Sequence, residues 1–159
     1  MNHPDVLLRT ADRKDLDKIN QVVEAAVMTW NLPERVKRLA MPSYRYNDHD
    51  LEHYEIVMAE SENRIIGIAA WDTTPHSGPE QTQVLLLHGI YVLPEQQHQG
   101  IGRELLAAVE MAARTRNIDG VLVKAQKDAE GFFKAQGLEK VSVQDSARDY
   151  ENRYWKRLE

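Results

Sequence analysis

A Gln-rich loop with two glycines, Gln97–Arg103, lies between an apolar run and an amphipathic stretch. Gly100 and Gly102 have no Cβ, so a ligand can approach their backbone closely. A helix that begins beside them would direct unpaired N–H groups and the positive end of its dipole toward that ligand. The loop therefore suits an anion, most simply a phosphate. The simpler alternative is that the glycines only turn the chain from strand to helix.

Two common phosphate-binding motifs do not fit this loop. A P-loop requires Gly-Lys-Ser/Thr, but Gly102 is followed by Arg103 and Glu104. A dinucleotide fingerprint requires a third glycine where Leu105 stands and an acid at the end of the next strand, whereas Asp119 precedes that strand. These mismatches argue against a nucleotide-binding oxidoreductase.

Histidine is the residue type most able to exchange protons at neutral pH, because its pKa lies at about 6.5. His88 is a candidate general base, or alternatively a core or cross-strand histidine, and a bulge in its strand would redirect the side chain. His98 could touch a phosphate, or be an exposed loop residue whose backbone binds. His49 and His53 have a spacing that could bind metal on a helix, but their surroundings offer no clear third ligand, so no metal is expected.

The composition limits the class of protein. A length of 159 residues suits a single domain over residues 1–159. A net charge of −5 argues against a nucleic-acid partner. We see neither a membrane-length apolar run nor a signal peptide, so we expect a cytoplasmic protein without a membrane partner. The absence of cysteine excludes disulfides, thiolate metal sites and a covalent cysteine intermediate.

The pattern of apolar residues predicts the elements that position these side chains. Alternation and β-branched runs indicate strands, and apolar residues at helical spacing indicate helices, the first of them capped by Thr10 or Asp12. The three runs from residue 54 to 92 predict an antiparallel meander. The predicted strands are 6–10, 54–61, 63–74, 82–92, 120–125, 139–144 and 152–159, and the predicted helices are 12–27, 33–40, 100–117 and 128–137. This order predicts a mixed α/β fold.

Two motifs in this order of elements resemble the GNAT superfamily of N-acetyltransferases. The family signature Gln/Arg-x-x-Gly-x-Gly/Ala corresponds to Gln97-His98-Gln99-Gly100-Ile101-Gly102. The downstream family pattern Asn-x-x-Ala-x-x-Phe-Tyr-x-x-x-Gly-Phe corresponds to Gln126-x-x-Ala129-x-x-Phe132-Phe133-x-x-x-Gly137-Leu138. The element order fits the family from about residue 6 to residue 158.

The resemblance implies the GNAT-like fold, a mixed and mostly antiparallel sheet of about seven strands flanked by about four helices. It also implies acetyl-coenzyme A as the cofactor, with its pyrophosphate on the loop amides and its pantetheine arm pairing like an extra strand with the strand over 82–92. The cofactor-binding residues implied are Ile90, Tyr91, Val92, Gln97, His98, Gln99, Gly100, Ile101, Gly102, Arg103, Gln126 and Phe133.

In the family, the acetyl group passes to an amine by direct attack in a ternary complex. The family's usual tyrosine acid is replaced here by Phe133, and its usual carboxylate base by Leu86, which leaves His88 as the candidate catalytic residue. A free thiol has a pKa of about 8.5, so the thiolate can still leave and take a proton from water. A non-catalytic acyl-coenzyme A sensor therefore remains the alternative.

The acceptor implied is a small-molecule or peptide amine of unidentified structure, and the resemblance is compatible with a homodimer. Aromatic residues fall where the family builds its acceptor pocket, and they can equally be packing residues under irregular loops. These candidates are Trp30, Tyr44, Tyr46, Tyr150 and Tyr154, whereas Phe132 and Trp155 are assigned to the core.

Overall fold

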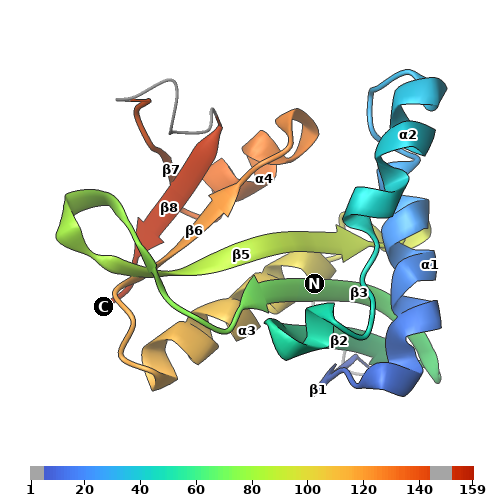
Figure 1. The fold of residues 1–159 in the computed structure, drawn as a ribbon, viewed down its shortest axis with the longest axis horizontal. Helices are drawn as coiled ribbons and strands as arrows, with labels where there is room; N and C mark the ends of the chain where they lie inside the picture. Colours follow the sequence, from blue (N-terminus) through green and yellow to red (C-terminus); the bar gives the residue numbers. More distant parts are fainter. Residues whose placement is uncertain (1–5, 144–151) are drawn as a thin grey trace.

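The computed structural model describes residues 6–143 and 152–159 of the chain and has a mixed α/β architecture (Figure 1). Its strands are β1 (Leu7–Thr10), β2 (Tyr54–Ser61), β3 (Arg64–Asp72), β4 (His76–Ser77), β5 (Gln83–Val92), β6 (Gly120–Lys124), β7 (Glu139–Lys140) and β8 (Arg153–Arg157). Its α-helices are α1 (Leu16–Val27), α2 (Glu34–Tyr44), α3 (Ile101–Thr115) and α4 (Glu130–Ala135). Within these ranges, no helix combines the length and apolar character that a membrane crossing requires.

The strands form one sheet in the order β1-β2-β3-β5-β6-β8-β7, with β4 paired to β5. The β2-β3-β5 neighbours are antiparallel, which confirms the predicted meander. The pair β5–β6 is parallel, because α3 carries the chain across one face of the sheet between them. The predicted mixed, mostly antiparallel sheet is thus confirmed. The strand expected over 139–144 is shorter than predicted, since β7 ends at Lys140.

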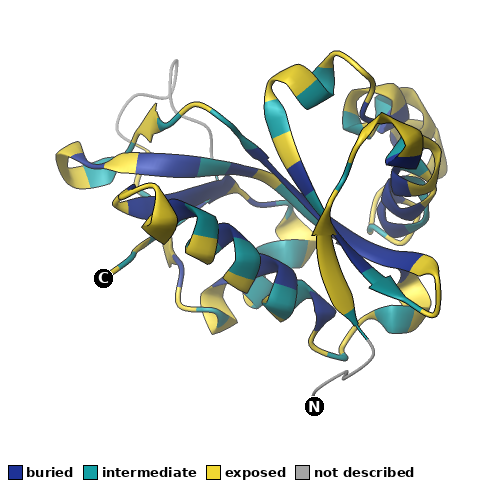
Figure 2. Cartoon of the chain, turned by 90° about the horizontal axis from the view of Figure 1, so that it is seen from below, coloured by how far each residue is buried: buried dark blue, intermediate teal, exposed yellow. Residues whose placement is uncertain are grey.

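The core lies on both faces of the central strands. Every residue of β3 from Ile65 to Trp71 is buried, and an unbroken buried run requires cover on both faces of a sheet. Helices α1 and α3 both pack on β3 and β5, and they lie on opposite sides of the sheet (Figure 2). The face of α3 toward the sheet is apolar, with Leu105 and Val109 fully buried, as its helical spacing predicted.

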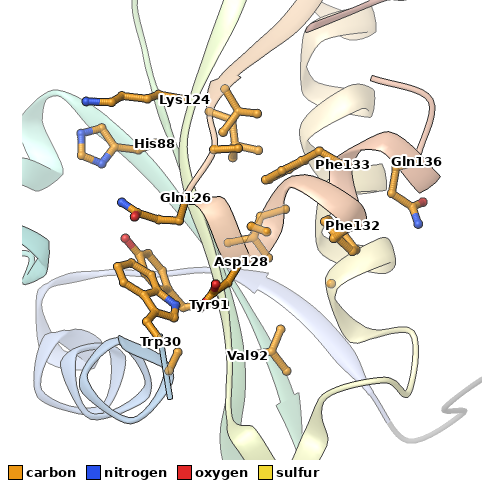
Figure 3. Close-up of a pocket in the computed structure, with 18 of the residues that line it drawn as sticks. Trp30, His88, Tyr91, Val92, Lys124, Gln126, Asp128, Phe132, Phe133 and Gln136 are labelled. Atoms are coloured by element: carbon orange, nitrogen blue, oxygen red, sulfur yellow. The ribbon is translucent and has the colours of Figure 1, made fainter. Parts of the chain in front are cut away.

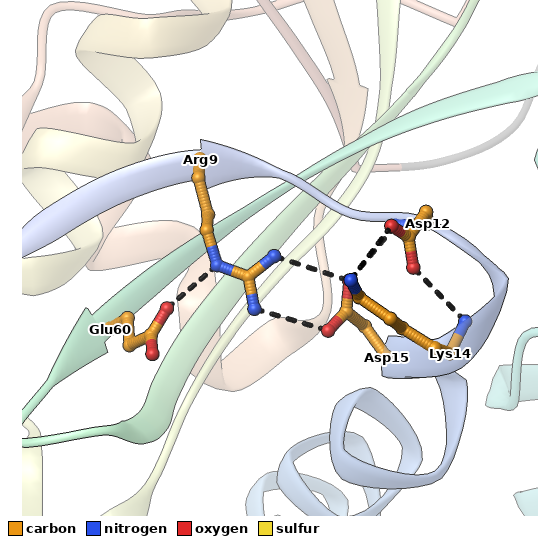
Figure 4. Close-up of polar contacts among 5 residues, drawn as sticks. All are labelled: Arg9, Asp12, Lys14, Asp15 and Glu60. Carbon is orange, nitrogen blue, oxygen red and sulfur yellow. Dashed lines mark hydrogen bonds and ion pairs between the residues drawn. The ribbon is translucent and has the colours of Figure 1, made fainter.

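An ion-pair network fixes the junction between β1 and α1 (Figure 4). Asp12 is the N-cap of the 3-10 turn that precedes α1, and the Asp15 carboxylate accepts a hydrogen bond from the Asp12 N–H, completing a capping box. The Arg9 guanidinium donates to both Asp15 and Glu60. Burial by itself would raise the pKa of Asp15, but hydrogen bonds from Arg9 and Asp12 more than offset it and leave the pKa below its usual range.

We expect Asp15→Asn to lower the free energy of unfolding by about 1–3 kcal/mol at pH 7, because it removes a charged acceptor from a buried site. A lowered pKa means that this contribution is present at neutral pH and is lost as the pH falls below about 4. Urea unfolding measures this at pH 7 and at pH 3. The difference in the free energy of unfolding between the variant and the wild type should be smaller at pH 3. Glu60→Gln, the control on the more exposed partner of Arg9, should cost less than about 1 kcal/mol.

Candidate functional site

The divergence of β5 from β6 creates a cavity in the middle of the sheet. The two strands pair in parallel only from Val84 with Gly120 to Leu87 with Val123. Beyond Leu87, β5 continues to Val92 beside β3, while β6 and β8 turn away from it (Figure 1). A cavity of about 1100 Å³ opens at this point. The backbone groups on this edge of β5 are thereby left available to an extended ligand.

The glycine loop forms one end of the cavity. Gly100 is the N-cap of α3 and adopts the left-handed conformation with φ of 86°, which only glycine enters without strain. The loop residues Gln97, His98, Gly100, Gly102 and Arg103 line the cavity. The first N–H groups of the 15-residue helix α3 have no carbonyl partner within the helix, so this end of the cavity is suited to a phosphate.

Not every residue of the loop faces the cavity. Ile101 is buried in the core at 1% exposure, and the Gln99 side-chain amide donates to the Glu95 carbonyl at 3.4 Å. A Cβ at Gly102 would lie 3.2 Å from the Phe132 ring, so this glycine makes room for an aromatic wall. Phe132, which the sequence assigned to the core, is only half-buried and lines the cavity.

A β-bulge turns His88 toward the cavity. In the register of β3 with β5, Ala70 lies opposite Gly89 and Trp71 lies opposite Leu87, which leaves His88 as the extra residue. Its side chain is exposed and lines the cavity, so it is not a core histidine. Figure 3 shows His88, Lys124 and Gln126 projecting to the side of the strands on which Trp30 lies, whereas Phe132, Phe133 and Gln136 come from the other side.

Two tyrosines surround the His88 imidazole. The Tyr46 hydroxyl lies 3.5 Å from Nδ1, and the Tyr54 ring centroid lies 4.5 Å from that of the imidazole. Although the imidazole is open to the cavity, partial desolvation by the surrounding protein lowers the pKa of His88, and the carboxylates of Asp72 and Asp50 oppose this shift. The net direction favours the neutral imidazole, which can accept a proton near pH 7.

The Tyr46 and Tyr91 hydroxyls keep their protons. Burial is the main cause that raises the pKa of Tyr46 well above its usual value, and burial likewise raises the pKa of Tyr91 to about 12. Tyr46 is buried and contacts His88 instead of lining the cavity itself. Both hydroxyls therefore stay protonated over the physiological pH range, and each can accept a hydrogen bond as well as donate one.

An aromatic cluster forms the wall beside α1 and α2. The Trp30 ring lies 5.1 Å from Tyr44 in an edge-to-face arrangement and 6.4 Å from Tyr91 in a stacked one. Trp30 and Tyr44 line the cavity, where the sequence expected acceptor-binding aromatics. Such a wall can hold an apolar or cationic group.

Strand β8 buries a different aromatic side chain from the one that the sequence predicted. Tyr154 has 0% exposure and donates a hydrogen bond to Glu130 at 3.1 Å, so it belongs to the core and not to the cavity wall. Trp155, expected in the core, is only half-buried. Successive side chains of a strand point to opposite faces, so the wrong prediction for Tyr154 entails the wrong prediction for Trp155. Tyr150 lies outside the described residues.

The segment after β6 supplies the rest of the cavity wall. Gln126 and Phe133 both line it, and the Gln126 amide approaches the Tyr44 hydroxyl at 3.5 Å. Phe133 is buried at 4% exposure and offers only a phenyl ring. Lys124, which belongs to neither of the two sequence motifs, also lines the cavity. Its signal was a charged residue at the carboxyl end of a buried parallel strand, a common ligand position.

The sequence matches a protein family, and the fold matches solved structures. The model of the acetyltransferase (GNAT) family matches residues 24–138, which is more than half of the chain. The chain is similar in structure to the PaiA N-acetyltransferase from Thermoplasma acidophilum in complex with coenzyme A, at a TM-score of 0.78 and 15% identity, covering 96% of this chain and 99% of that one. No curated protein matches the sequence.

Two further solved structures have the same fold. A GNAT family acetyltransferase from Brucella melitensis in complex with acetyl-CoA aligns at a TM-score of 0.68 and 17% identity, covering 99% of this chain and 90% of that one. A putative acetyltransferase of the GNAT family from Desulfovibrio desulfuricans aligns at a TM-score of 0.69 and 24% identity, covering 97% and 98% of the respective chains.

Proposed function

The chain belongs to the acetyltransferase (GNAT) family, and we propose that it transfers the acetyl group of acetyl-CoA to an amine by direct attack in a ternary complex. The observation that carries this proposal is the divergence of β5 from β6, which joins an anion-binding loop and a neutral histidine in one cavity. Acetyl-coenzyme A has an anionic end and a reactive end connected by an amide-bearing arm. The cavity supplies a matching chemical group for each part.

The residues present fit the cofactor. Gly100 and the first turn of α3 offer backbone N–H groups to the pyrophosphate, and Arg103 adds a positive charge beside them. The edge of β5 from Ile90 to Val92 offers N–H and C=O groups to the pantetheine amides. We assign to a backbone N–H of the same segment the role of stabilising the thioester oxyanion that develops during transfer. Two complexes of similar fold contain coenzyme A or acetyl-CoA, which supports this assignment.

The other side of the cavity suits an amine acceptor. A primary alkylamine has a pKa of about 10.4 and attacks only when neutral, so a base must remove its proton. The lowered pKa of His88 favours its neutral form, and the imidazole is open to the cavity, so we assign it the role of general base, acting directly or through water. In this role the Nδ1–H of the imidazole donates a hydrogen bond to the Tyr46 hydroxyl oxygen, which leaves the lone pair of Nε2 to accept the proton of the amine. Trp30 and Tyr44 then form the aromatic face against which the acceptor packs.

A second candidate function is binding of acyl-coenzyme A without catalysis. Leu86 and Phe133 favour it, because neither can transfer a proton at the positions where the resemblance expects a base and an acid. The two functions are separated by an assay that mixes the protein with acetyl-CoA and a panel of amines and measures the free thiol of the coenzyme A that is released. Thiol release that depends on the amine supports the transferase, and tight cofactor binding without such release supports the sensor.

Phe133→Tyr tests how the thiolate leaves. We expect this variant to bind acetyl-CoA as tightly as the wild type, because the added hydroxyl extends a ring that already lines the cavity. Its turnover should rise if the new hydroxyl donates a proton to the departing sulfur. Calorimetry and steady-state rates measure the two effects separately. A large loss of cofactor affinity in a folded variant would contradict the place assigned to Phe133.

A further inference from the structure

Three potential metal ligands converge in the connection between α2 and β2. His49 and His53 flank the 3-10 helix η2 (Asp50–Glu52), of which Glu52 is the last residue. One ligand atom from each of these three side chains lies within 4.8 Å of the ligand atoms of the other two. We propose that His49, Glu52 and His53 form a binding site for a divalent transition metal such as zinc.

The distances are close to those that a metal needs. His49 Nδ1 lies 3.2 Å from Glu52 Oε2, and the rings of His49 and His53 are 4.7 Å apart between centroids. Zinc bonds of about 2.0–2.2 Å place neighbouring ligand atoms about 3.3–3.5 Å apart in a tetrahedral site. All three side chains are exposed, so no core packing opposes rotation of their ligand atoms toward these distances.

Local hydrogen bonds hold the backbone that carries the ligands. Asn47 and Asp50 exchange two bonds, since the Asn47 N–H donates to the Asp50 carboxylate at 2.8 Å and the Asp50 N–H donates to the Asn47 side-chain oxygen at 2.9 Å. The Glu52 N–H donates to the His49 carbonyl at 3.1 Å, and the His53 N–H donates to the Asp50 carbonyl at 3.0 Å. The turn is thus formed before any metal binds, and side chains three and four residues apart emerge on one side of it.

The ligand set selects the class of metal. Two imidazoles and one carboxylate suit zinc and neighbouring transition metals, whereas magnesium and calcium prefer oxygen ligands alone. Three protein ligands leave a coordination position for water. The sequence indicated His49 and His53 as a possible pair of ligands but no third one. In the structure, the Glu52 carboxylate lies close enough to both histidines to be the third ligand.

The site lies where a metal would restrain the proposed acceptor side. The segment between Tyr46 and Tyr54 contains all three ligands, and both of these tyrosines contact His88. A metal that joins His49 to His53 cross-links the two ends of this segment. We therefore expect zinc to raise the melting temperature, whether or not the chain is an acetyltransferase.

The test is titration of the metal-free, tag-free full chain with zinc chloride by calorimetry. We expect one zinc ion per chain. His49→Ala, Glu52→Gln and His53→Ala should each weaken binding at least about tenfold, because even changes outside the ligand shell commonly cost 10–100-fold. The matched control is His76→Ala, since His76 is also exposed and lies 2.9 Å from a carboxylate of Asp72, but within residues 6–143 and 152–159 it belongs to no group of three potential ligands.

A cobalt titration followed by absorption spectroscopy reports the coordination directly, and zinc should stabilise the wild type but not the His49→Ala variant against heat. Because the three ligands are exposed, their substitution leaves the core intact. The proposal is overturned if zinc does not bind saturably at one site, if Glu52→Gln binds like the wild type, or if His76→Ala loses as much affinity as the ligand variants.

Discussion

Gly100→Glu is expected to weaken binding of acetyl-CoA at least about 100-fold, which corresponds to about 2.8 kcal/mol. The new side chain would carry a negative charge into the loop proposed to hold the pyrophosphate, and its bulk would occupy the space that the phosphate needs. The backbone adds a further cost, since φ of 86° at Gly100 is unfavourable for any residue with a Cβ. Calorimetry with acetyl-CoA and with coenzyme A measures the loss.

Two companion variants separate charge from backbone strain. Gly100→Ala introduces the strain without the charge, so it should lose less affinity than Gly100→Glu. Gly131→Glu introduces the same charge at a glycine in α4 whose Cβ would meet nothing within 4 Å, so its affinity should stay near wild type. Unchanged affinity for acetyl-CoA in a folded Gly100→Glu protein would show that this loop does not bind the cofactor.

His88→Ala is expected to lower turnover by about 10²-fold or more, because general base catalysis typically contributes 10²–10⁴-fold. The imidazole is open to the cavity and packs only partly against Tyr46 and Tyr54, so its removal should leave the fold intact. Steady-state rates with a responsive amine, taken together with the melting temperature, measure both effects. His76→Ala, at an exposed histidine outside the cavity, should retain the wild-type rate.

The pH dependence of the rate identifies the titrating group. The pKa of His88 is lowered by desolvation, against the opposing carboxylates of Asp72 and Asp50, so the neutral base should persist to a pH below about 6.5. The value of kcat/KM should therefore fall on the acid side of that value as the imidazole becomes protonated, and this acid limb should be missing in His88→Ala. A normal rate with an unaltered pH profile, or a lower melting temperature with a normal rate per folded molecule, would show His88 to be structural.

The order of elements and the glycine loop could be predicted from the sequence because both depend on neighbouring residues. Apolar periodicity predicted the β2-β3-β5 meander and the buried face of α3. The spacing of Gly100 and Gly102 predicted a loop open to an anion, and the structure places both glycines in the cavity wall. The two departures from the family pattern, Leu86 and Phe133, were also readable directly from the chain.

What the side chains face was decided by the tertiary structure, because it depends on contacts between segments far apart in the chain. The bulge that turns His88 into the cavity exists only in the register between β3 and β5. The pairing of β8 with β6 sends Tyr154 inward and leaves Trp155 half-buried, and a shift of one residue would exchange the two. The cavity itself opens because β5 stays beside β3 after β6 has left it, which no local pattern of either strand encodes.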